Sequence, residues 1–165
     1  MRYEVRPALP TDLPAVAALQ SHGFGSQSAG QAATAVGELD SPNRWLWVAV
    51  AHSDAADHAR PVGYARLRLA DVATEPPIGY YLSGVVVDPG HRGHGIGGQL
   101  IRARMDFAWS VGAPALYYFA NSRNATSIKL HAKLGFREIK RPFEFPGFAF
   151  ENGFGVLFRL ERPTA

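Results

Sequence analysis

Five glycines lie between Val87 and the apolar segment that follows residue 98, in the stretch DPGHRGHGIGG. Glycine is costly to order, so such a cluster indicates a backbone that another group approaches closely. The next residues, QLIRARMDFAWSV, have the apolar spacing of a helix. The loop would therefore present successive backbone N–H groups at a helix N-terminus, where the helix dipole favours negative charge. The chemistry that this predicts is the binding of an anionic group such as a diphosphate.

The same glycines fit two nucleotide-binding patterns. Gly93, Gly95 and Gly98 match G-x-G-x-x-G, the fingerprint of dinucleotide-binding folds. That fingerprint expects its first glycine almost directly after a strand, and an acidic residue about 20 positions later to hold a ribose. Here DPGHR precedes Gly93, and the segment ALYYFANS beyond the helix contains no Asp or Glu. The context argues against a dinucleotide site, which leaves the second pattern or a ligand-free glycine turn.

The second pattern, R-x-x-G-x-G, is matched by Arg92, Gly95 and Gly97 and resembles the pyrophosphate-binding signature of the GNAT N-acetyltransferase superfamily. The resemblance implies that the diphosphate of coenzyme A touches the loop amides, because the glycines have no side chains to keep it away. It also implies that Arg92 adds positive charge, with a solvent-exposed loop arginine as the alternative. The implied coenzyme contacts in the loop are Arg92, Gly93, His94, Gly95, Ile96, Gly97 and Gly98.

A second stretch, NATSIKLHAKLGF, resembles the other signature of that superfamily, N-x-x-A/S-x-x-L-Y-x-x-x-G-F. The resemblance implies that Asn124 contacts the pantetheine arm of the coenzyme, whereas the alternative is that Asn124 caps a helix. The tyrosine of the signature, which protonates the departing thiolate, is replaced by His131. Since an imidazole is a competent proton donor near neutral pH, we expect His131 to be the general acid. A histidine buried in the core is the alternative.

Three valines, Val85, Val86 and Val87, end the strand before the glycine loop. The resemblance implies that this strand splays, so that its backbone groups pair with pantetheine amides. It further implies that one backbone N–H there faces the acetyl carbonyl, as in an oxyanion hole. The valines are expected to be core residues as well.

The chain contains no cysteine, which excludes a cysteine acyl-enzyme, and the resemblance implies direct attack of an amine on the thioester. Superfamily members that acetylate peptide N-termini often carry a Glu five residues before the Asn of the second signature. That position holds Phe119, which argues against that base and that class of substrate. The candidates for the base are Glu75, Tyr81 and Glu144, with a chain of waters as the alternative.

The C-terminal stretch is unusually rich in phenylalanine. Such a set suggests an apolar acceptor site or a homodimer contact, and core packing is a third explanation. No acidic cluster is present to bind a large polycationic acceptor, so we favour a small amine or an amino-acid-like acceptor. The phenylalanines are Phe143, Phe145, Phe148, Phe150 and Phe154.

The elements that must position these residues alternate between strands and helices. Hydrophobic periodicity and turn signals predict strands at 3–9, 44–51, 61–70, 79–87 and 115–120, and a C-terminal hairpin turning at Asn152-Gly153. Helices are expected after Thr11-Asp12, over 29–39, from the glycine loop to 111, and over 124–134. With the resemblance, this order predicts a single GNAT-like α/β (α+β) domain over residues 1–165. Its sheet is mixed, mostly antiparallel and splayed at its middle, with helices on both faces.

Composition narrows the class of protein. The chain of 165 residues is 47% hydrophobic and 12% aromatic, which is typical of a folded globular protein. Without cysteine it has neither disulfides nor thiolate metal sites, in agreement with a cytoplasmic protein, and we expect no metal. Its net charge is +3, but the 17 basic residues are scattered among 14 acidic ones, which argues against nucleic-acid binding. No apolar run suggests a signal peptide or a membrane span.

Together, the sequence predicts an acetyl-CoA-dependent N-acetyltransferase that transfers the acetyl group directly to a primary amine. A non-catalytic acetyl-CoA sensor, for which the replacement of tyrosine by His131 and the missing base would speak, is the alternative.

Overall fold

The computed structural model describes residues 1–23, 39–53, 59–71 and 76–164. The chain divides into two compact units, Met1–Leu67 with Gly84–Arg104, and Arg68–Ser83 with Met105–Ala165. Seven strands form one sheet in the order β1-β2-β3-β4-β5-β7-β6. Both β3 (Arg60–Ala70) and β4 (Gly79–Val87) continue from one unit into the other. The sheet is mostly antiparallel, as the sequence predicts, and β4 pairs parallel with β5.

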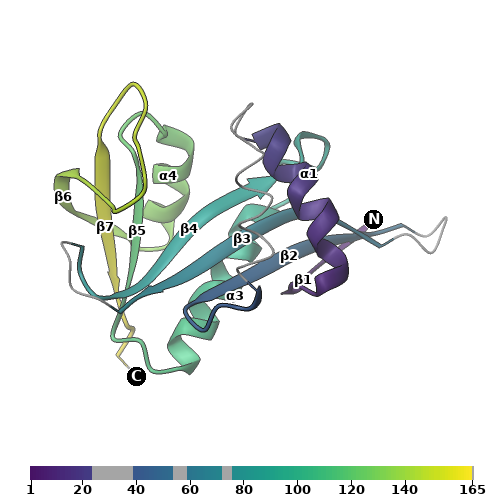
Figure 1. Ribbon diagram of the computed structural model, residues 1–165, viewed down its shortest axis with the longest axis horizontal. Coiled ribbons are helices and arrows are strands. Elements are labelled where there is room, and N and C mark those ends of the chain that lie inside the picture. Colours follow the sequence, from purple (N-terminus) through teal and green to yellow (C-terminus); the bar gives the residue numbers. More distant parts are fainter. Residues whose placement is uncertain (24–38, 54–58, 72–75, 165) are drawn as a thin grey trace. The chain divides into compact units, whose positions relative to one another are not determined.

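The first unit begins with β1 (Arg2–Pro7), which pairs antiparallel with β2 (Arg44–His52) from Arg2 opposite His52 to Pro7 opposite Trp47. Helix α1 (Leu13–Gly23) lies across β2 and β3 (Figure 1). It covers them because its apolar side chains recur at helical spacing and pack on the buried strand residues. This core cluster consists of Val16, Leu19, Leu46, Val48, Val50, Tyr64 and Val86.

A short 3-10 helix, η1 (Pro10–Asp12), joins β1 to α1. The buried carboxylate of Asp12 accepts hydrogen bonds from the Leu9 amide at 2.7 Å and from both terminal nitrogens of Arg6 at 2.7 and 3.0 Å. Burial by itself would raise the pKa of Asp12, but these hydrogen bonds and the charge of Arg6 lower it below its usual value. The junction is thus fixed by a bidentate ion pair.

The second unit is built on β5 (Ala115–Asn121) and β7 (Gly155–Glu161), which pair antiparallel along their full lengths. The edge strand β6 (Arg137–Phe143) pairs antiparallel with β7. Helix α4 (Ala125–Lys133) lies beside β5 (Figure 1). On β5, Tyr118 and Phe119 point to opposite faces, since successive side chains of a strand alternate.

Strand β4 leads through η3 (Pro89–His91) into α3 (Ile96–Ser110). The Asp88 carboxylate accepts a hydrogen bond from the Gly90 amide at 2.8 Å, which starts the turn. In the pairing of β4 with β5, Tyr80–Leu82 of β4 lie opposite Leu116–Tyr118. Gly84, two residues later, has a φ of 56°. Such a left-handed residue interrupts regular strand geometry, in keeping with the expected irregularity of this strand.

The predicted elements agree with the described ones to within a few residues, with two exceptions. The helix expected over 29–39 lies almost entirely outside the described residues. The chain turns at Asn152, whose φ is +54°, as expected, but this turn does not directly join two paired strands, because β6 ends at Phe143 and β7 begins only at Gly155. Pro146 and Gly147 lie in the connecting segment 144–154, where proline cannot donate a ladder hydrogen bond.

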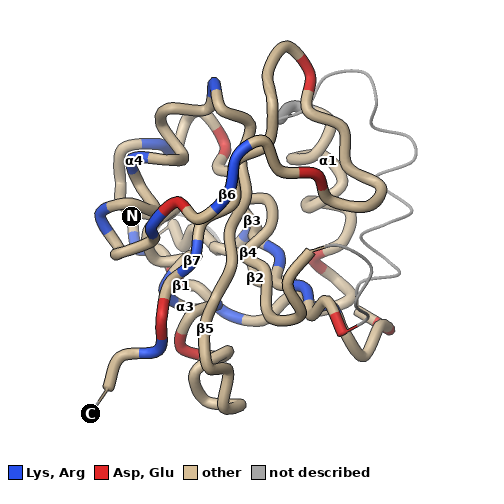
Figure 2. Tube along the Cα trace, turned by 90° about the vertical axis from the view of Figure 1, so that its left-hand side faces the viewer, with Lys and Arg blue, Asp and Glu red and all other residues tan. Residues whose placement is uncertain are grey.

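None of the described helices is long and apolar enough to cross a membrane. Within the same described ranges, no group of three or more His, Cys, Asp or Glu side chains could hold a metal ion. Basic and acidic positions are interspersed along the trace (Figure 2), so the described part of the chain presents no long basic tract.

Candidate functional site

The glycine loop has a backbone conformation that favours glycine. Gly93 and Gly95 have φ values of +79° and +75°, in the left-handed region that side-chain-bearing residues avoid. A Cβ added at either glycine would meet no heavy atom within 4 Å. The glycines are therefore required by backbone conformation rather than by crowding, and the open space beside them leaves the loop accessible to a ligand.

Helix α3 begins inside this loop, at Ile96. The amide of Gln99 donates to the carbonyl of Gly95 at 3.1 Å, which closes the first helical turn. The amides of Ile96, Gly97 and Gly98 precede that bond, so they are the N-terminal donors that a helix cannot pair internally. Together with the helix dipole, they make this end of the first unit suited to a negative group.

Two loop side chains are tied back to the protein. The Nε of Arg92 donates to the carbonyl of Val87 at 3.1 Å, which orients the guanidinium beside the end of β4. His94 is exposed, and its Nδ1 lies 3.2 Å from the carbonyl oxygen of His91. Arg92 is thus solvent-accessible, but it is oriented by the strand that precedes the loop.

Tyr3, near the N-terminus on β1, supports the loop from outside its own sequence. Its hydroxyl lies 3.1 Å from Nδ1 of His91, and the two rings meet edge to face with centroids 5.8 Å apart. The Tyr3 and His94 rings have centroids 5.5 Å apart. No sequence pattern points to Tyr3, because nothing in the sequence relates two residues that are 88 positions apart.

The valines preceding the loop are core residues, as expected. Val86 is buried in the core cluster of the first unit, and Val85 and Val87 are half-buried. A Cβ added at Gly63 on β3 would lie 3.0 Å from the carbonyl oxygen of Val86, so the backbones approach closely there. The proposed pairing of the Val85–Val87 backbone with a pantetheine arm stays a prediction.

Asn124 acts as the N-cap of α4. Its Oδ1 accepts a hydrogen bond from the Ser127 amide at 3.2 Å, which satisfies one of the unpaired donors at the start of the helix. The capping alternative is therefore correct, and it is compatible with ligand contact. Since Oδ1 makes the cap, the side chain offers its Nδ2 hydrogens.

His131 is a buried residue of the second unit, with only 2% of its surface exposed. Its ring stacks on Tyr118 with centroids 3.5 Å apart and an angle of 4° between the planes, and it meets Phe136 edge to face. Its Nδ1 lies 2.9 Å from the carbonyl oxygen of Ser127, so Nδ1 carries the hydrogen. To act as an acid, His131 would need a second proton on Nε2 inside an aromatic stack. The geometry favours the core-histidine interpretation.

Two of the three candidate bases, Tyr81 and Glu144, lie within the described residues. Glu75 lies outside the described residues. Tyr81 is fully buried and donates its hydroxyl hydrogen to the carbonyl of Pro77 at 2.7 Å. Burial, with a smaller contribution from Tyr117, raises the pKa of Tyr81 well above its usual value, which makes it a poor base at neutral pH. Glu144 is exposed and lines a pocket in the second unit.

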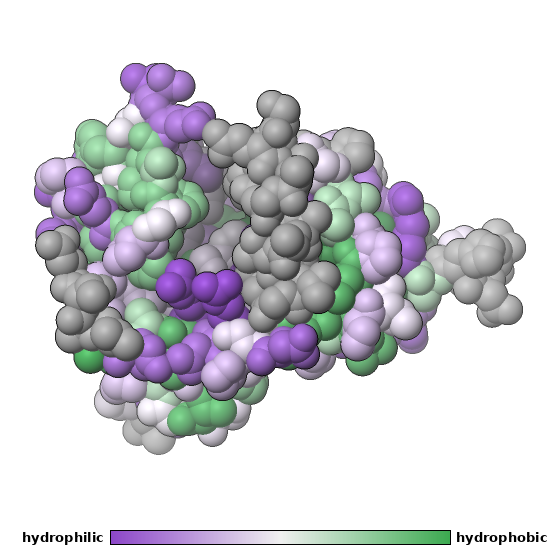
Figure 3. All heavy atoms as spheres, viewed as in Figure 1, coloured by the Kyte–Doolittle hydropathy of each residue, from purple (hydrophilic) through white to green (hydrophobic). Residues whose placement is uncertain are grey.

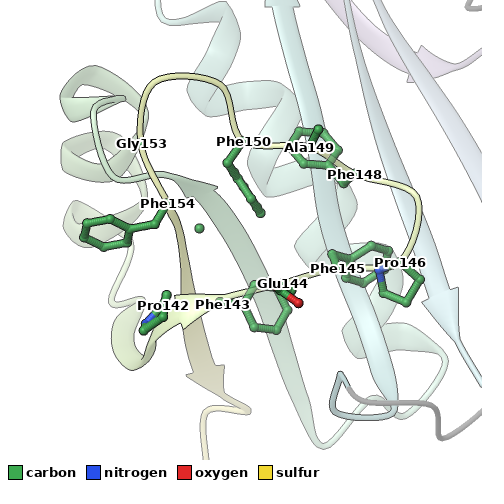
Figure 4. A pocket seen from close by; sticks show the side chains of 11 residues that line it. Pro142, Phe143, Glu144, Phe145, Pro146, Phe148, Ala149, Phe150, Gly153 and Phe154 are labelled. Atoms are coloured by element: carbon green, nitrogen blue, oxygen red, sulfur yellow. The ribbon is translucent and has the colours of Figure 1, made fainter.

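That pocket has a volume of about 420 Å³ and is lined by residues 142–146, 148–150 and 153–155 (Figure 4). Phe119 of β5 is the hub of the aromatic rings around it, with centroid distances of 4.8 Å to Phe145, 5.2 Å to Phe148 and 5.9 Å to Phe150. The phenylalanine-rich stretch thus forms a pocket wall around Phe119, which occupies the position where superfamily members that acetylate peptide N-termini often carry a Glu.

Residues 30–136 fit the sequence model of the acetyltransferase (GNAT) family. Over 86 residues the chain is 36% identical to an uncharacterized protein of Mycobacterium leprae (strain TN). That match covers 52% of this chain and 23% of the relative, so it spans about a quarter of the relative's length.

Several solved structures have the same fold. NAA60 of Arabidopsis thaliana, in complex with acetyl-CoA, matches with a TM-score of 0.80 at 18% identity, over 97% of this chain and 98% of that one. AAC(6')-Iy, bound to a bisubstrate analogue, matches with a TM-score of 0.75 at 20% identity, over 90% and 100%. The ribosomal-protein-S18-alanine N-acetyltransferase of Escherichia coli matches with a TM-score of 0.71 at 19% identity, over 99% and 96%.

Proposed function

Because the chain belongs to the GNAT acetyltransferase family, we propose that it is an acetyl-CoA-dependent N-acetyltransferase acting on a primary amine. The observation that carries the proposal is the glycine loop at the start of α3. Its two left-handed glycines and its unpaired helix amides form an open surface for a diphosphate. Family membership supports the diphosphate of coenzyme A as that ligand.

The proposed coenzyme contacts are of three kinds. Residues 92–98 hold the diphosphate, with Arg92 adding charge from beside Val87. The backbone of Val85–Val87 pairs with the pantetheine amides, and one of its N–H groups stabilises the developing oxyanion. Asn124 offers its Nδ2 hydrogens to the pantetheine arm while its Oδ1 caps α4.

The reaction is a direct transfer. The nitrogen lone pair of a neutral amine attacks the thioester carbonyl carbon, an N–C bond forms, and the C–S bond breaks with its electron pair going to sulfur. The amine nitrogen loses one proton and the thiolate gains one, so the products are an N-acetyl amide and free coenzyme A.

Proton transfer in this chain does not rely on Tyr81, whose hydroxyl is engaged with Pro77. His131 would be an acid only if its stacked ring were protonated on Nε2, so water is the better proton donor to the departing thiolate. Water is also the simplest acceptor of the amine proton, with Glu144 as the described carboxylate on the pocket wall.

The acceptor that we propose is a small amine or an amino-acid-like molecule. The solved relatives differ in acceptor, since a ribosomal-protein alanine N-acetyltransferase and AAC(6')-Iy share this fold. In this chain Phe119 and its aromatic neighbours fill the region where a base for peptide N-termini would stand. An apolar wall favours a small, partly apolar acceptor over a polar peptide terminus.

Thermal unfolding with and without acetyl-CoA tests the coenzyme site. Binding to the native state at 100 times Kd should stabilise it by about 2.7 kcal/mol. We expect Gly95→Glu to lose the rise in midpoint, because a carboxylate repels the diphosphate. Gly112→Glu is the matched control, since Gly112 also has a positive φ, +87°, and open space around its Cβ.

Turnover is then measured as release of free coenzyme A thiol with a panel of primary amines. If the wild type shows no midpoint shift at millimolar acetyl-CoA, the loop is a ligand-free turn and the proposal fails. A shift without turnover on any amine would instead identify an acetyl-CoA sensor.

A further inference from the structure

We propose that the pocket enclosed by residues 142–155 binds an arylalkylamine, holding its apolar ring among the phenylalanines and its ammonium group at Glu144. The inference rests on the proposed function, because it names the acceptor class of the same enzyme. It is carried by the pocket itself, which lies wholly within the second unit.

The pocket has the size and composition of a small-molecule site. Its volume of about 420 Å³ falls within the range of roughly 300 to 1,000 Å³ that is usual for ligand pockets. Five phenylalanines, two prolines and an alanine line it, with two glycines and a single ionisable side chain, Glu144. Figure 4 shows Phe150 projecting into the space between the two arms of the loop, with Glu144 on the opposite arm.

The loop that forms the pocket is held in place before any ligand arrives. Asn121 donates its Nδ2 hydrogen to the carbonyl of Glu151 at 2.7 Å, and the amide of Ser122 donates to the carbonyl of Phe154 at 2.8 Å. A Cβ at Gly153 would overlap Oδ1 of Asn121, so this close approach requires glycine. A pre-formed site loses less conformational entropy on binding.

Part of the aromatic wall is exposed although it packs against other rings. Phe148 is 53% exposed and Phe154 is 42% exposed, and Figure 3 shows apolar atoms gathered on this part of the second unit. Exposed apolar patches of this kind mark ligand or protein contacts. A flat aromatic ligand would cover the exposed part of Phe148, whose ring Phe119 already meets edge to face at 5.2 Å.

The charge of the pocket lining indicates which polar group the ligand carries. Glu144 makes no ion pair with another described residue, whereas Glu138 is paired with Arg141. Two arginines lie on neighbouring rings, Arg68 over Phe145 at 5.1 Å and Arg141 over Phe154 at 5.9 Å, so cations already cover these two ring faces and Glu144 is the group that can pair with an ammonium. One carboxylate suits one ammonium group, and amines of pKa near 10 are protonated at neutral pH.

The ammonium form of the amine binds at Glu144, whereas only the neutral form attacks the thioester. Because the bound amine must release its proton before attack, acetylation should rise with pH while affinity for the amine falls. A polyamine would gain only one ion pair here and has no ring to stack, so it should bind worse than the arylalkylamine.

The test is a calorimetric titration of the full chain with 2-phenylethylamine and with 2-phenylethanol, which has the same ring and no charge. We expect the amine to bind two- to fivefold more tightly than the alcohol, as for one exposed ion pair. Glu144→Gln should bring the two affinities within a factor of two. Glu151→Gln is the matched control, since Glu151 lies in the same loop but does not line the pocket.

Phe148→Ala should weaken both ligands about threefold to tenfold, because it removes an exposed wall of the site without cutting into the core. The proposal is overturned if amine and alcohol bind equally to the wild type, or if Glu144→Gln keeps the preference for the amine. It is also overturned if the chain is a dimer that Phe148→Ala dissociates while neither ligand binds, because the patch is then a contact between copies.

Acetyl-CoA separates this inference from the proposed function. Glu144→Gln should keep the full midpoint shift with acetyl-CoA. Loss of phenylethylamine binding with acetyl-CoA binding intact would refute the acceptor class alone. Phenylethylamine binding in a chain without affinity for acetyl-CoA would refute the proposed function but support the pocket as a binding site for arylalkylamines.

Discussion

Replacing His131 with phenylalanine and with alanine distinguishes a core histidine from a general acid. Phenylalanine keeps the stack on Tyr118 but loses the hydrogen bond from Nδ1 to the Ser127 carbonyl, which contributes about 1 kcal/mol. Alanine also loses the stack, worth about 1 kcal/mol, and leaves a cavity that adds about 1 to 2 kcal/mol. We therefore expect unfolding free energies lower by about 1 kcal/mol for His131→Phe and by about 3 to 4 kcal/mol for His131→Ala.

Two assays follow from these values. Urea unfolding measures the free-energy losses, and coenzyme A release with a reactive amine measures kcat as a function of pH. A core histidine predicts that His131→Phe keeps kcat within about threefold and leaves the pH profile unchanged. A general acid predicts a loss of about 10² to 10⁴ in kcat. A stable His131→Phe protein that has lost 100-fold or more in kcat would refute our interpretation of the stacked ring.

Three further predictions concern parts of the structure outside that stack. Asp12→Asn should lower the free energy of unfolding by about 1 to 3 kcal/mol at pH 7, because the carboxylate pairs with Arg6. Folding lowers the pKa of Asp12 below 3.8, so the difference in stability from wild type should persist above pH 3.8 and vanish as the pH falls through the folded pKa. Urea unfolding between pH 2 and 7 measures this difference. Tyr3→Phe should weaken acetyl-CoA binding about threefold to tenfold in calorimetry with an unchanged unfolding midpoint, because it removes the contact to His91; equal affinity would show that the loop holds its shape unaided. Asn124→Asp should keep the helix cap and raise KM for acetyl-CoA, whereas an unchanged KM would limit Asn124 to capping.

Local sequence determines most of the secondary structure of this chain. Strand β4 lies at Gly79–Val87, where its apolar pattern predicts it, and α4 begins after Asn124, whose side chain is a natural cap. The left-handed glycines of the loop were predictable for the same reason, since only glycine adopts that conformation at low cost. The hairpin was the exception, because β6 leaves β7 at Phe143 and the chain first turns at Pro146-Gly147, between the bridge partners Phe145 and Phe148.

Local sequence did not determine the roles of side chains whose neighbours are distant in sequence. The signature placed His131 on α4, but only the packed structure shows its ring stacked on Tyr118 with Nδ1 engaged. Tyr81 was a candidate base by type, and its burial with a hydrogen bond to Pro77 argues against that role.

The sequence by itself determined the family, the order of the elements and the glycine loop at the start of α3, because each depends on residue types at fixed short spacings. The tertiary structure alone decided which side chains are buried, that Tyr3 reaches His91, and that Phe119 gathers rings from β6 and the segment after it. The physical reason is that burial and stacking depend on which strands pair, and no local spacing in the sequence encodes that pairing.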